Sequence, residues 1–175
     1  MQNKRIVFMG SPLIASEYLQ ILIQNKYNII GVYTQPPRPK GRGMTIQKCP
    51  VHNEALKNKL EIYHPKNFND KKTIDTFINL KPDFVVVMAY GILLPEVILD
   101  KPQYGFINIH VSLLPKWRGA SPIEHALLNG DKKTGVSIFR LINKLDSGPI
   151  LSQSSLMIEN NINKDDLTNK LKEIG

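Results

Sequence analysis

Three polar residues, Asn108, His110 and Asp146, have the types and spacing that acyl-transfer chemistry requires. Asn108 and His110 are two residues apart in the apolar segment GFINIHV (105–111), so a strand there would place both on one face and its branched apolar residues on the other. An amide and a protonated imidazole can donate hydrogen bonds to the oxygen that becomes negative when a carbonyl is attacked. A carboxylate at Asp146 would favour the protonated imidazole and could relay a proton.

Each of these residues also has a structural interpretation. Asn and His within strands are commonly hydrogen-bonded core or edge residues. Asp146 lies beside Gly148 in the segment LDSGPI (145–150), and Asp is frequent in turns. The pattern alone therefore leaves both a catalytic and a structural role open.

The elements that would position these residues alternate between strands and helices. Apolar runs predict strands at 6–9, 29–34, 62–64, 84–89, 105–111, 135–141 and 149–157. Helical periodicity predicts helices at 13–24, 51–60, 70–80, 122–128 and 165–174. Ser121 is the expected N-cap of the fourth helix, with Pro122 at its first position, and Gly175 can cap the last helix.

This order predicts an α/β fold with an open, mostly parallel twisted sheet and helices on both faces. The continuous apolar run 84–89 is typical of a strand covered on both sides. Ligands of such sheets bind beyond the carboxyl ends of the strands, which is where Asn108 and His110 lie. The longest Gly/Pro-rich connection, 35–44, is expected to be a functional or disordered loop.

Composition excludes several classes of function. With 175 residues, one domain is expected, and a single cysteine, Cys49, permits no internal disulfide. We expect a cytoplasmic protein, because no run resembles a signal peptide or a membrane span. The segment GSPL (10–13) lacks a dinucleotide fingerprint and no Walker loop occurs, so neither NAD nor ATP is implied. Cys49, His52 and His64 match no zinc spacing, and no metal is expected.

The net charge of +8 permits binding to nucleic acid or small anions without proving either. A local cluster is more informative. The loop 35–44 carries Arg38, Lys40 and Arg42 on Gly/Pro-rich backbone and could reach phosphates or splayed bases, although it could equally be a solvated surface loop.

Residues 105–151 resemble the folate-dependent formyltransferases, whose pattern is Asn-x-His in a strand, a loop close to SLLPxxRG, and a later Asp-x-Gly. The loop TQPPRPKGRG (34–43) and the segment PKWRGASPI (115–123) further resemble the members of this family that formylate initiator tRNA. The resemblance covers almost the whole chain and is weakest at 70–80. It differs at Val111, where a small residue is common, and at MTI (44–46), where basic residues are common.

Membership implies transfer of a formyl group from 10-formyltetrahydrofolate, as co-substrate, to the amino group of methionyl initiator tRNA. Asn108 and His110 would stabilise the tetrahedral intermediate and Asp146 would assist proton transfer, with no covalent enzyme intermediate. The resemblance implies folate binding by two segments, consisting of Val87, Met88, Ala89, Tyr90, Gly91, Ile92 and Leu93, and of Ser112, Leu113, Leu114 and Pro115. It implies tRNA contacts from Arg38, Lys40, Arg42, Trp117 and Arg118. Ile92 and Leu93 could also serve as core residues, and Trp117 could pin its loop to the core.

Residues 1–175 are thus expected to be a formyltransferase catalytic domain, with the OB-like, tRNA-binding C-terminal domain of the family absent from this chain. We expect a monomer without a membrane partner. Two other interpretations remain. One is a small-molecule N-formyltransferase, acting on glycinamide ribonucleotide or an amino sugar, or a formyltetrahydrofolate hydrolase, against which the cationic loop argues. The other is a non-catalytic folate- or RNA-binding module, which would not need the Asn108, His110 and Asp146 set.

Overall fold

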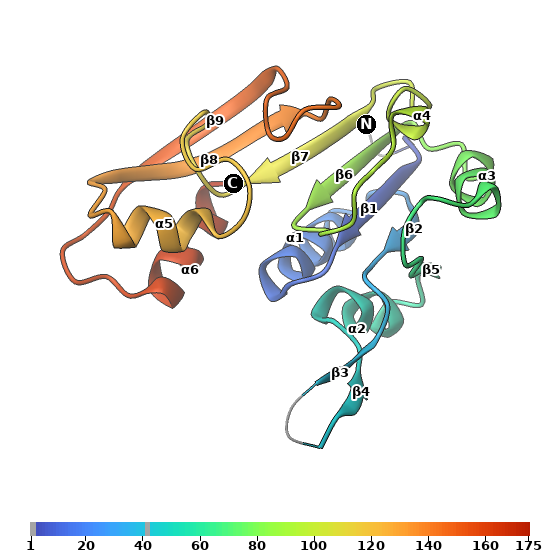
Figure 1. Ribbon diagram of the computed structural model, residues 1–175, viewed down its shortest axis with the longest axis horizontal. Coiled ribbons are helices and arrows are strands. Elements are labelled where there is room, and N and C mark those ends of the chain that lie inside the picture. Colours follow the sequence, from blue (N-terminus) through green and yellow to red (C-terminus); the bar gives the residue numbers. More distant parts are fainter. Residues whose placement is uncertain (1–2, 41–42) are drawn as a thin grey trace. The chain divides into compact units, whose positions relative to one another are not determined.

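The computed structural model describes residues 3–40 and 43–175. Its chain divides into two compact units, Met1–Phe106 (unit 1) and Ile107–Gly175 (unit 2). Figure 1 labels the helices and strands of both units.

Unit 1 alternates parallel strands with helices. Its sheet has the order β5-β2-β1-β6, and all three pairings in it are parallel. The strands are β1 (Ile6–Gly10), β2 (Ile29–Tyr33), β5 (Ile62–Tyr63) and β6 (Phe84–Met88). The helices are α1 (Leu13–Gln24), α2 (Pro50–Lys57), α3 (Lys71–Asn79) and the short α4 (Glu96–Leu99), which the sequence did not predict.

Burial of consecutive residues shows that the central strand is covered on both faces. Val7, Phe8 and Met9 of β1 are all fully buried, although neighbouring side chains point to opposite sides. On the neighbouring strand β2, the ring of Tyr33 stacks on Tyr63 of β5, with 4.8 Å between their centroids. The same ring meets Phe77 of α3 edge-on at 5.9 Å. These apolar contacts hold α3 to the sheet and confirm the covered, parallel strands that the apolar runs predicted.

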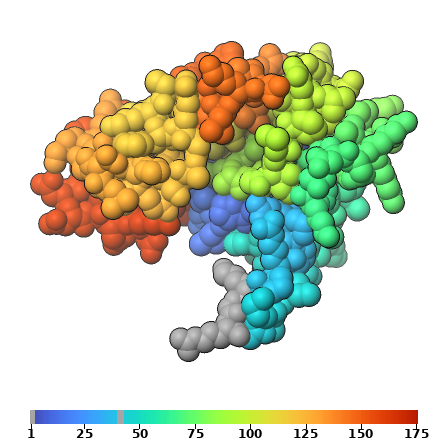
Figure 2. All heavy atoms as spheres, viewed as in Figure 1, coloured from blue at the N-terminus to red at the C-terminus, as the bar shows by residue number. Residues whose placement is uncertain are grey.

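A two-stranded hairpin replaces the irregular loop that the Gly/Pro-rich composition of 35–44 suggested. Strands β3 (Arg38–Lys40) and β4 (Thr45–Gln47) pair antiparallel, with Arg38 opposite Gln47. The pairing escaped prediction because β3 is only three residues long and contains Pro39, which cannot donate a ladder hydrogen bond. In Figures 1 and 2 the hairpin extends away from α2 and the rest of unit 1.

Unit 2 places two helices on one face of antiparallel strands. β7 (Phe106–His110), which begins at the last residue of unit 1, pairs with β8 (Lys133–Arg140), and β8 pairs with β9 (Ile150–Met157). Helices α5 (Pro122–Leu128) and α6 (Lys164–Ile174) lie on the same side of these strands (Figure 1). Their core is an apolar cluster of Ile123, Val136, Leu167 and Leu171, with Ile109 and Val111 packed against it.

Helix ends agree with the sequence in part. Pro122 is the first residue of α5, as predicted, and Gly175 stands at the C-cap of α6. The predicted capping role of Ser121 is wrong: its φ is 55° and its side chain makes no capping hydrogen bond. An N-cap hydroxyl reaches the helix amides from extended backbone, and the left-handed conformation of Ser121 removes that geometry.

The predicted α/β class and mostly parallel sheet are confirmed by these elements. No helix in the described ranges is both long enough and apolar enough to cross a membrane.

Candidate active site

Strand β7 presents its two polar residues on one buried face, as predicted. Asn108 is 9% exposed and His110 is 7% exposed, and both lie on the same side as the buried Phe106. The other face carries Ile109, which packs against the helix-covered apolar cluster of unit 2. The apolar face of β7 therefore packs against the core under the helices, and its polar face, with Asn108 and His110, is the one available to a ligand.

The imidazole of His110 is oriented by the loop that follows β7. Its Nε2 lies 2.8 Å from the backbone oxygen of Trp117. A carbonyl oxygen can only accept, so Nε2 is the nitrogen that carries a proton in this hydrogen bond. Trp117 has a φ of 58°, a left-handed conformation that is uncommon outside glycine. The ring is thereby fixed with Nδ1 on its other side.

That other side faces Asp146. Oδ2 of Asp146 lies 3.7 Å from Nδ1 of His110 and accepts a hydrogen bond of 2.7 Å from the backbone N–H of Gly119. Asp146 is 8% exposed and has a φ of 41°. The structure therefore brings Asp146 to His110 over 36 residues of sequence, as the catalytic interpretation requires.

Gly148 allows the turn that carries Asp146 to approach β8 closely. A Cβ atom at position 148 would lie 1.7 Å from the backbone oxygen of Arg140. Arg140 in turn donates its N–H to the oxygen of Pro149 at 2.9 Å. The glycine of the DSG segment is therefore required by contact with the end of β8.

The side chain of Asn108 differs from that of His110 in its hydrogen bonding. In the ranges 3–40 and 43–175, its amide group has no hydrogen-bond partner, while its atoms remain slightly accessible. An amide that is accessible and unpaired can bond a ligand without breaking a hydrogen bond within the protein. The arrangement suits a donor that acquires its partner from a bound ligand.

The loop 112–117 is fastened to the strands by side chains that the sequence analysis missed. The Ser137 hydroxyl of β8 accepts from the N–H of Leu114 at 3.0 Å and donates to the oxygen of Ser112 at 2.6 Å. Gln153 of β9 donates to the oxygen of Leu114 at 3.0 Å and to the Ser137 hydroxyl at 2.8 Å. A single Ser or Gln in a strand forms no sequence pattern, so the sequence did not indicate that Ser137 and Gln153 hold this loop.

These bonds narrow how the predicted folate residues of this loop can act. Ser112 is fully buried, and its hydroxyl donates to the oxygen of Lys116 at 2.6 Å. Both backbone groups of Leu114 are already bonded. Leu113, which is half-buried, and Pro115, which is exposed, are the residues of this set best placed to contact a ligand.

The predicted folate segment of unit 1 alternates buried and accessible residues. Val87, Met88 and Tyr90 are buried, whereas Ala89 and Gly91 are exposed and Leu93 is 88% exposed; Ile92 is half-buried. The high exposure of Leu93 rules out the simple core role considered for it. Ligand contacts from this segment must therefore come mainly from its backbone and from its accessible members.

Two further residues fix this segment. The backbone oxygen of Tyr90 accepts from the Ser11 hydroxyl at 3.3 Å and from Nε2 of Gln35 at 3.1 Å. Gly91 has a φ of 73°, and a Cβ there would lie 2.3 Å from Nε2 of Gln35. Ser11 and Gln35 follow the ends of β1 and β2. Polar residues just after parallel strands are candidates for a site, and this position was the sequence feature that could have identified them.

The predicted tRNA residues fall in several places. Arg38 is exposed in β3, and Lys40 ends the same strand. Arg42 lies outside the described residues. Arg118 is exposed, whereas Trp117 is half-buried and donates its Nε1–H to Asp131 at 2.7 Å. The side chain of Trp117 thus pins its loop, which is the structural role considered for it.

His52 and His64 stack with ring centroids 5.8 Å apart. His52 is buried, and its Nδ1 has no partner among the described residues; burial, followed by the charges of Lys48 and His64, lowers its pKa. Within the described ranges, no group of three or more His, Cys, Asp or Glu side chains could hold a metal ion. The histidines and Cys49 do not form such a centre.

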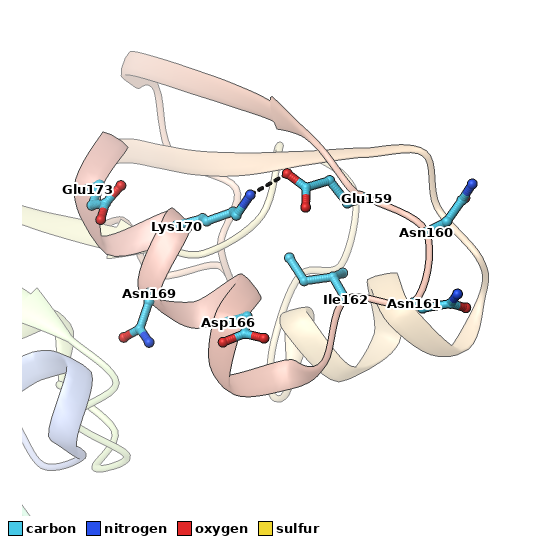
Figure 3. A pocket seen from close by; sticks show the side chains of 8 residues that line it. All are labelled: Glu159, Asn160, Asn161, Ile162, Asp166, Asn169, Lys170 and Glu173. Atoms are coloured by element: carbon cyan, nitrogen blue, oxygen red, sulfur yellow. Dashed lines mark hydrogen bonds and ion pairs between the residues drawn. The ribbon is translucent and has the colours of Figure 1, made fainter.

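A hollow of about 400 Å³ lies in unit 2 beside α6, apart from the site residues. Figure 3 shows its polar side chains and the Lys170–Glu159 ion pair, which come from α6 and from the turn between β9 and α6. None of the predicted site residues lines it.

Comparisons with known proteins identify the family and the fold of this chain. The family model described as Formyl transferase matches residues 4–175. Methionyl-tRNA formyltransferases of Wolbachia sp. subsp. Drosophila simulans and of Legionella pneumophila strain Corby are 48% and 42% identical, over 98% and 100% of this chain. The matches cover 57% and 56% of those proteins, so the chain spans just over half of their length.

Solved structures show the same fold. Phosphoribosylglycinamide formyltransferase from Bacillus halodurans has a TM-score of 0.78 at 23% identity, covering 97% of this chain and 88% of that one. A formyltetrahydrofolate deformylase from Pseudomonas syringae pv. tomato has a TM-score of 0.74 at 21% identity, covering 99% and 57%. With the motif residues gathered on β7 and its following loops, and the family model matched along nearly all of the chain, this chain belongs to the formyl transferase family.

Proposed function

We propose that this chain is the catalytic domain of an enzyme that transfers a formyl group from 10-formyltetrahydrofolate to the amino group of methionyl initiator tRNA. The observation that carries the proposal is the placement of His110 between the Trp117 carbonyl and the Asp146 carboxylate, beside an Asn108 amide that has no partner in the described part of the chain. Such a set is suited to a carbonyl that gains negative charge on attack.

The choice of acceptor is supported by sequence similarity. The relatives from Wolbachia and Legionella named methionyl-tRNA formyltransferase are 48% and 42% identical to this chain, whereas the two structural neighbours named above for other formyl-group reactions are 23% and 21% identical. The exposed Arg38 on the projecting β3–β4 hairpin provides a cation suited to phosphate contacts. Arg42, Lys40, Trp117 and Arg118 are proposed as further tRNA contacts.

In the proposed reaction, the methionyl nitrogen attacks the formyl carbon and a C–N bond forms. The carbonyl oxygen takes the electron pair and is stabilised by the Asn108 amide as hydrogen-bond donor and by the positive charge of protonated His110, whose Nε2–H stays bonded to the Trp117 carbonyl. The nitrogen loses a proton toward Asp146, through water where direct reach is lacking. The bond from the formyl carbon to N10 of the donor then breaks, and N10 leaves carrying the proton that the methionyl nitrogen gave up, which Asp146 returns through water.

The residues proposed to contact the donor are the accessible members of the two predicted segments, Ala89, Gly91, Ile92 and Leu93 of the first and Leu113 and Pro115 of the second, with the remaining residues of both serving as supports. A pterin edge can pair with backbone donors and acceptors while apolar side chains form its walls. We further propose a cytoplasmic monomer.

The test is a single-turnover assay with the purified chain, 10-formyltetrahydrofolate and methionyl initiator tRNA, beside a tube without tRNA. Formation of formyl-methionyl-tRNA that depends on His110 supports the proposal. Equal consumption of the donor in both tubes would instead identify hydrolysis. Donor binding by calorimetry without any turnover would favour the non-catalytic binding module.

An acceptor-side variant sharpens this assay. Arg38→Ala is expected to raise KM for the tRNA and to reduce its salt dependence, without changing donor affinity. Lys170→Met, at the hollow beside α6 and paired with Glu159, is the matched loss of one positive charge and is expected to leave both parameters unchanged.

A further inference from the structure

We infer that Asp131 is a positioning residue of the reaction centre, acting through Trp117 on the imidazole of His110. The inference rests on the proposed function for its catalytic consequence, although its structural part can be tested without turnover. Asp131 follows α5 and belongs to neither the Asn-x-His strand nor the Asp-x-Gly turn.

The carboxylate of Asp131 binds the loop after β7 at two points. Oδ2 accepts from Nε1 of Trp117 at 2.7 Å, and Oδ1 accepts from Nζ of Lys116 at 2.7 Å. Its side chain is only 9% exposed, whereas that of Lys116 is 56% exposed. The indole contact is therefore the sheltered one, and charge-assisted bonds of this kind are the stronger class.

The indole is held on its faces as well as at its nitrogen. The ring of His125 from α5 stacks on it with a centroid distance of 5.2 Å and an angle of 11° between planes. Nζ of Lys116 lies 5.1 Å from the centroid of the indole ring. Three neighbours thus determine where the Trp117 side chain lies.

The backbone of Trp117 needs this restraint. Its φ of 58° costs about 1–2 kcal/mol for a residue with a Cβ. In this conformation its carbonyl oxygen lies 2.8 Å from Nε2 of His110. Without the tie to Asp131, the residue is free to relax toward the ordinary region, and the carbonyl would turn away from the imidazole.

Asp131 is itself fixed by the way α5 ends. Gly130 has a φ of 62° and donates to the oxygen of Leu127 at 3.1 Å, while the N–H of Asp131 donates to the oxygen of Ala126 at 3.0 Å. These two bonds form the Schellman motif, a rigid helix terminus. The chain of contacts therefore runs from a helix end, through an indole, to the proton-bearing nitrogen of His110.

The first test measures the ring nitrogens of His110 by ¹⁵N NMR on the full chain, with the signals assigned by their loss in His110→Gln. The native protein is expected to show the Nε2–H tautomer of the neutral ring. Asp131→Ala and Trp117→Phe are each expected to give a mixture of tautomers. Asp131→Asn retains an oxygen that can accept from the indole and is expected to restore the native signals.

The second test measures formyl transfer by the same variants. Asp131→Ala and Trp117→Phe are each expected to lower kcat by roughly 10- to 100-fold, because small displacements of reacting groups are costly, with KM for the donor unchanged. The double variant is expected to lose no more than the worse single variant, since both changes break one link. Glu159→Gln is the control: Glu159 also pairs with a lysine, in this case Lys170, but it lines the hollow beside α6, which none of the predicted site residues lines.

The outcomes separate the two proposals. Unchanged His110 signals in folded Asp131→Ala and Trp117→Phe would overturn the positioning role, whatever the activity. A raised KM for the tRNA at unchanged kcat would also overturn it and assign the cluster to acceptor binding. If the His110 signals change in the variants but the native protein transfers no formyl group, the structural link is supported and the proposed function is refuted.

Discussion

Replacing Gly148 by alanine should displace Asp146 and disable the site while leaving most of the protein folded. The added Cβ would lie 1.7 Å from the backbone oxygen of Arg140, whereas Cβ contacts below 3.0 Å are essentially never seen. The turn must therefore move by more than about 1 Å, because the oxygen belongs to a packed strand that cannot yield as a side chain would.

This movement acts on the carboxylate two residues away. Asp146 accepts from Gly119 at 2.7 Å and lies 3.7 Å from the imidazole of His110, and neither distance can be kept after such a shift. A displacement of about 1 Å can cost on the order of 100-fold in rate. We expect kcat for formyl transfer to fall by about that factor, with KM for the donor nearly unchanged.

Single-turnover formylation by Gly148→Ala measures this effect, beside circular dichroism to show that the variant is folded. Ser147→Ala is the control in the same turn, because it adds no atoms and removes only an exposed hydrogen bond of 2.8 Å to the oxygen of Leu145. A folded Gly148→Ala protein with native kcat would refute the reasoning that ties the turn to the site.

Other predictions concern individual side chains. Asn108→Ala is expected to lower kcat by about 10²–10³ with donor binding retained, and parallel loss of both would contradict its role in the transition state. Ser137→Ala breaks three hydrogen bonds of a fully buried hydroxyl and should lower the free energy of unfolding by ~1–3 kcal/mol in urea titrations; a loss near zero would show that the loop is held elsewhere. Hydrogen bonds from Lys116 and Trp117 lower the pKa of Asp131 from 3.8, so its folded form binds fewer protons than its unfolded form. The stability advantage of the native protein over Asp131→Asn should therefore be full above that value and vanish as the pH falls through the lower folded pKa, and a difference that grows on acidification would contradict it.

The polar face of β7 and most strands and helices, though not α4 or the β3–β4 pair, were predictable because they depend on local periodicity. Alternation placed Asn108 and His110 on one side of a strand, and the structure has them there. The proximity of Asp146 to His110 came only from family resemblance, since nothing local indicates which loop folds back on a strand. Periodicity carries information about faces, whereas long-range contacts depend on tertiary packing.

The parts that escaped prediction depend on unusual backbone and on isolated polar residues. Trp117 and Asp146 adopt left-handed conformations that glycine would have signalled and that these residues do not. Asp131 follows Gly130 and has the sequence appearance of an ordinary turn residue. Ser137 and Gln153 are single polar residues in strands, where their bonds to the next loop leave no pattern.

The two flanking partners of His110 share a property with evolutionary consequences. Trp117 and Asp146, together with Gly119 and Asp131 that hold them, all belong to the chain segment 107–175. The projecting β3–β4 hairpin belongs to the other unit. Under the proposed function, the groups that handle the proton are therefore encoded in one segment and the hairpin cation proposed for the acceptor, Arg38, in the other, so separate mutations change the acceptor contact and the proton-handling groups.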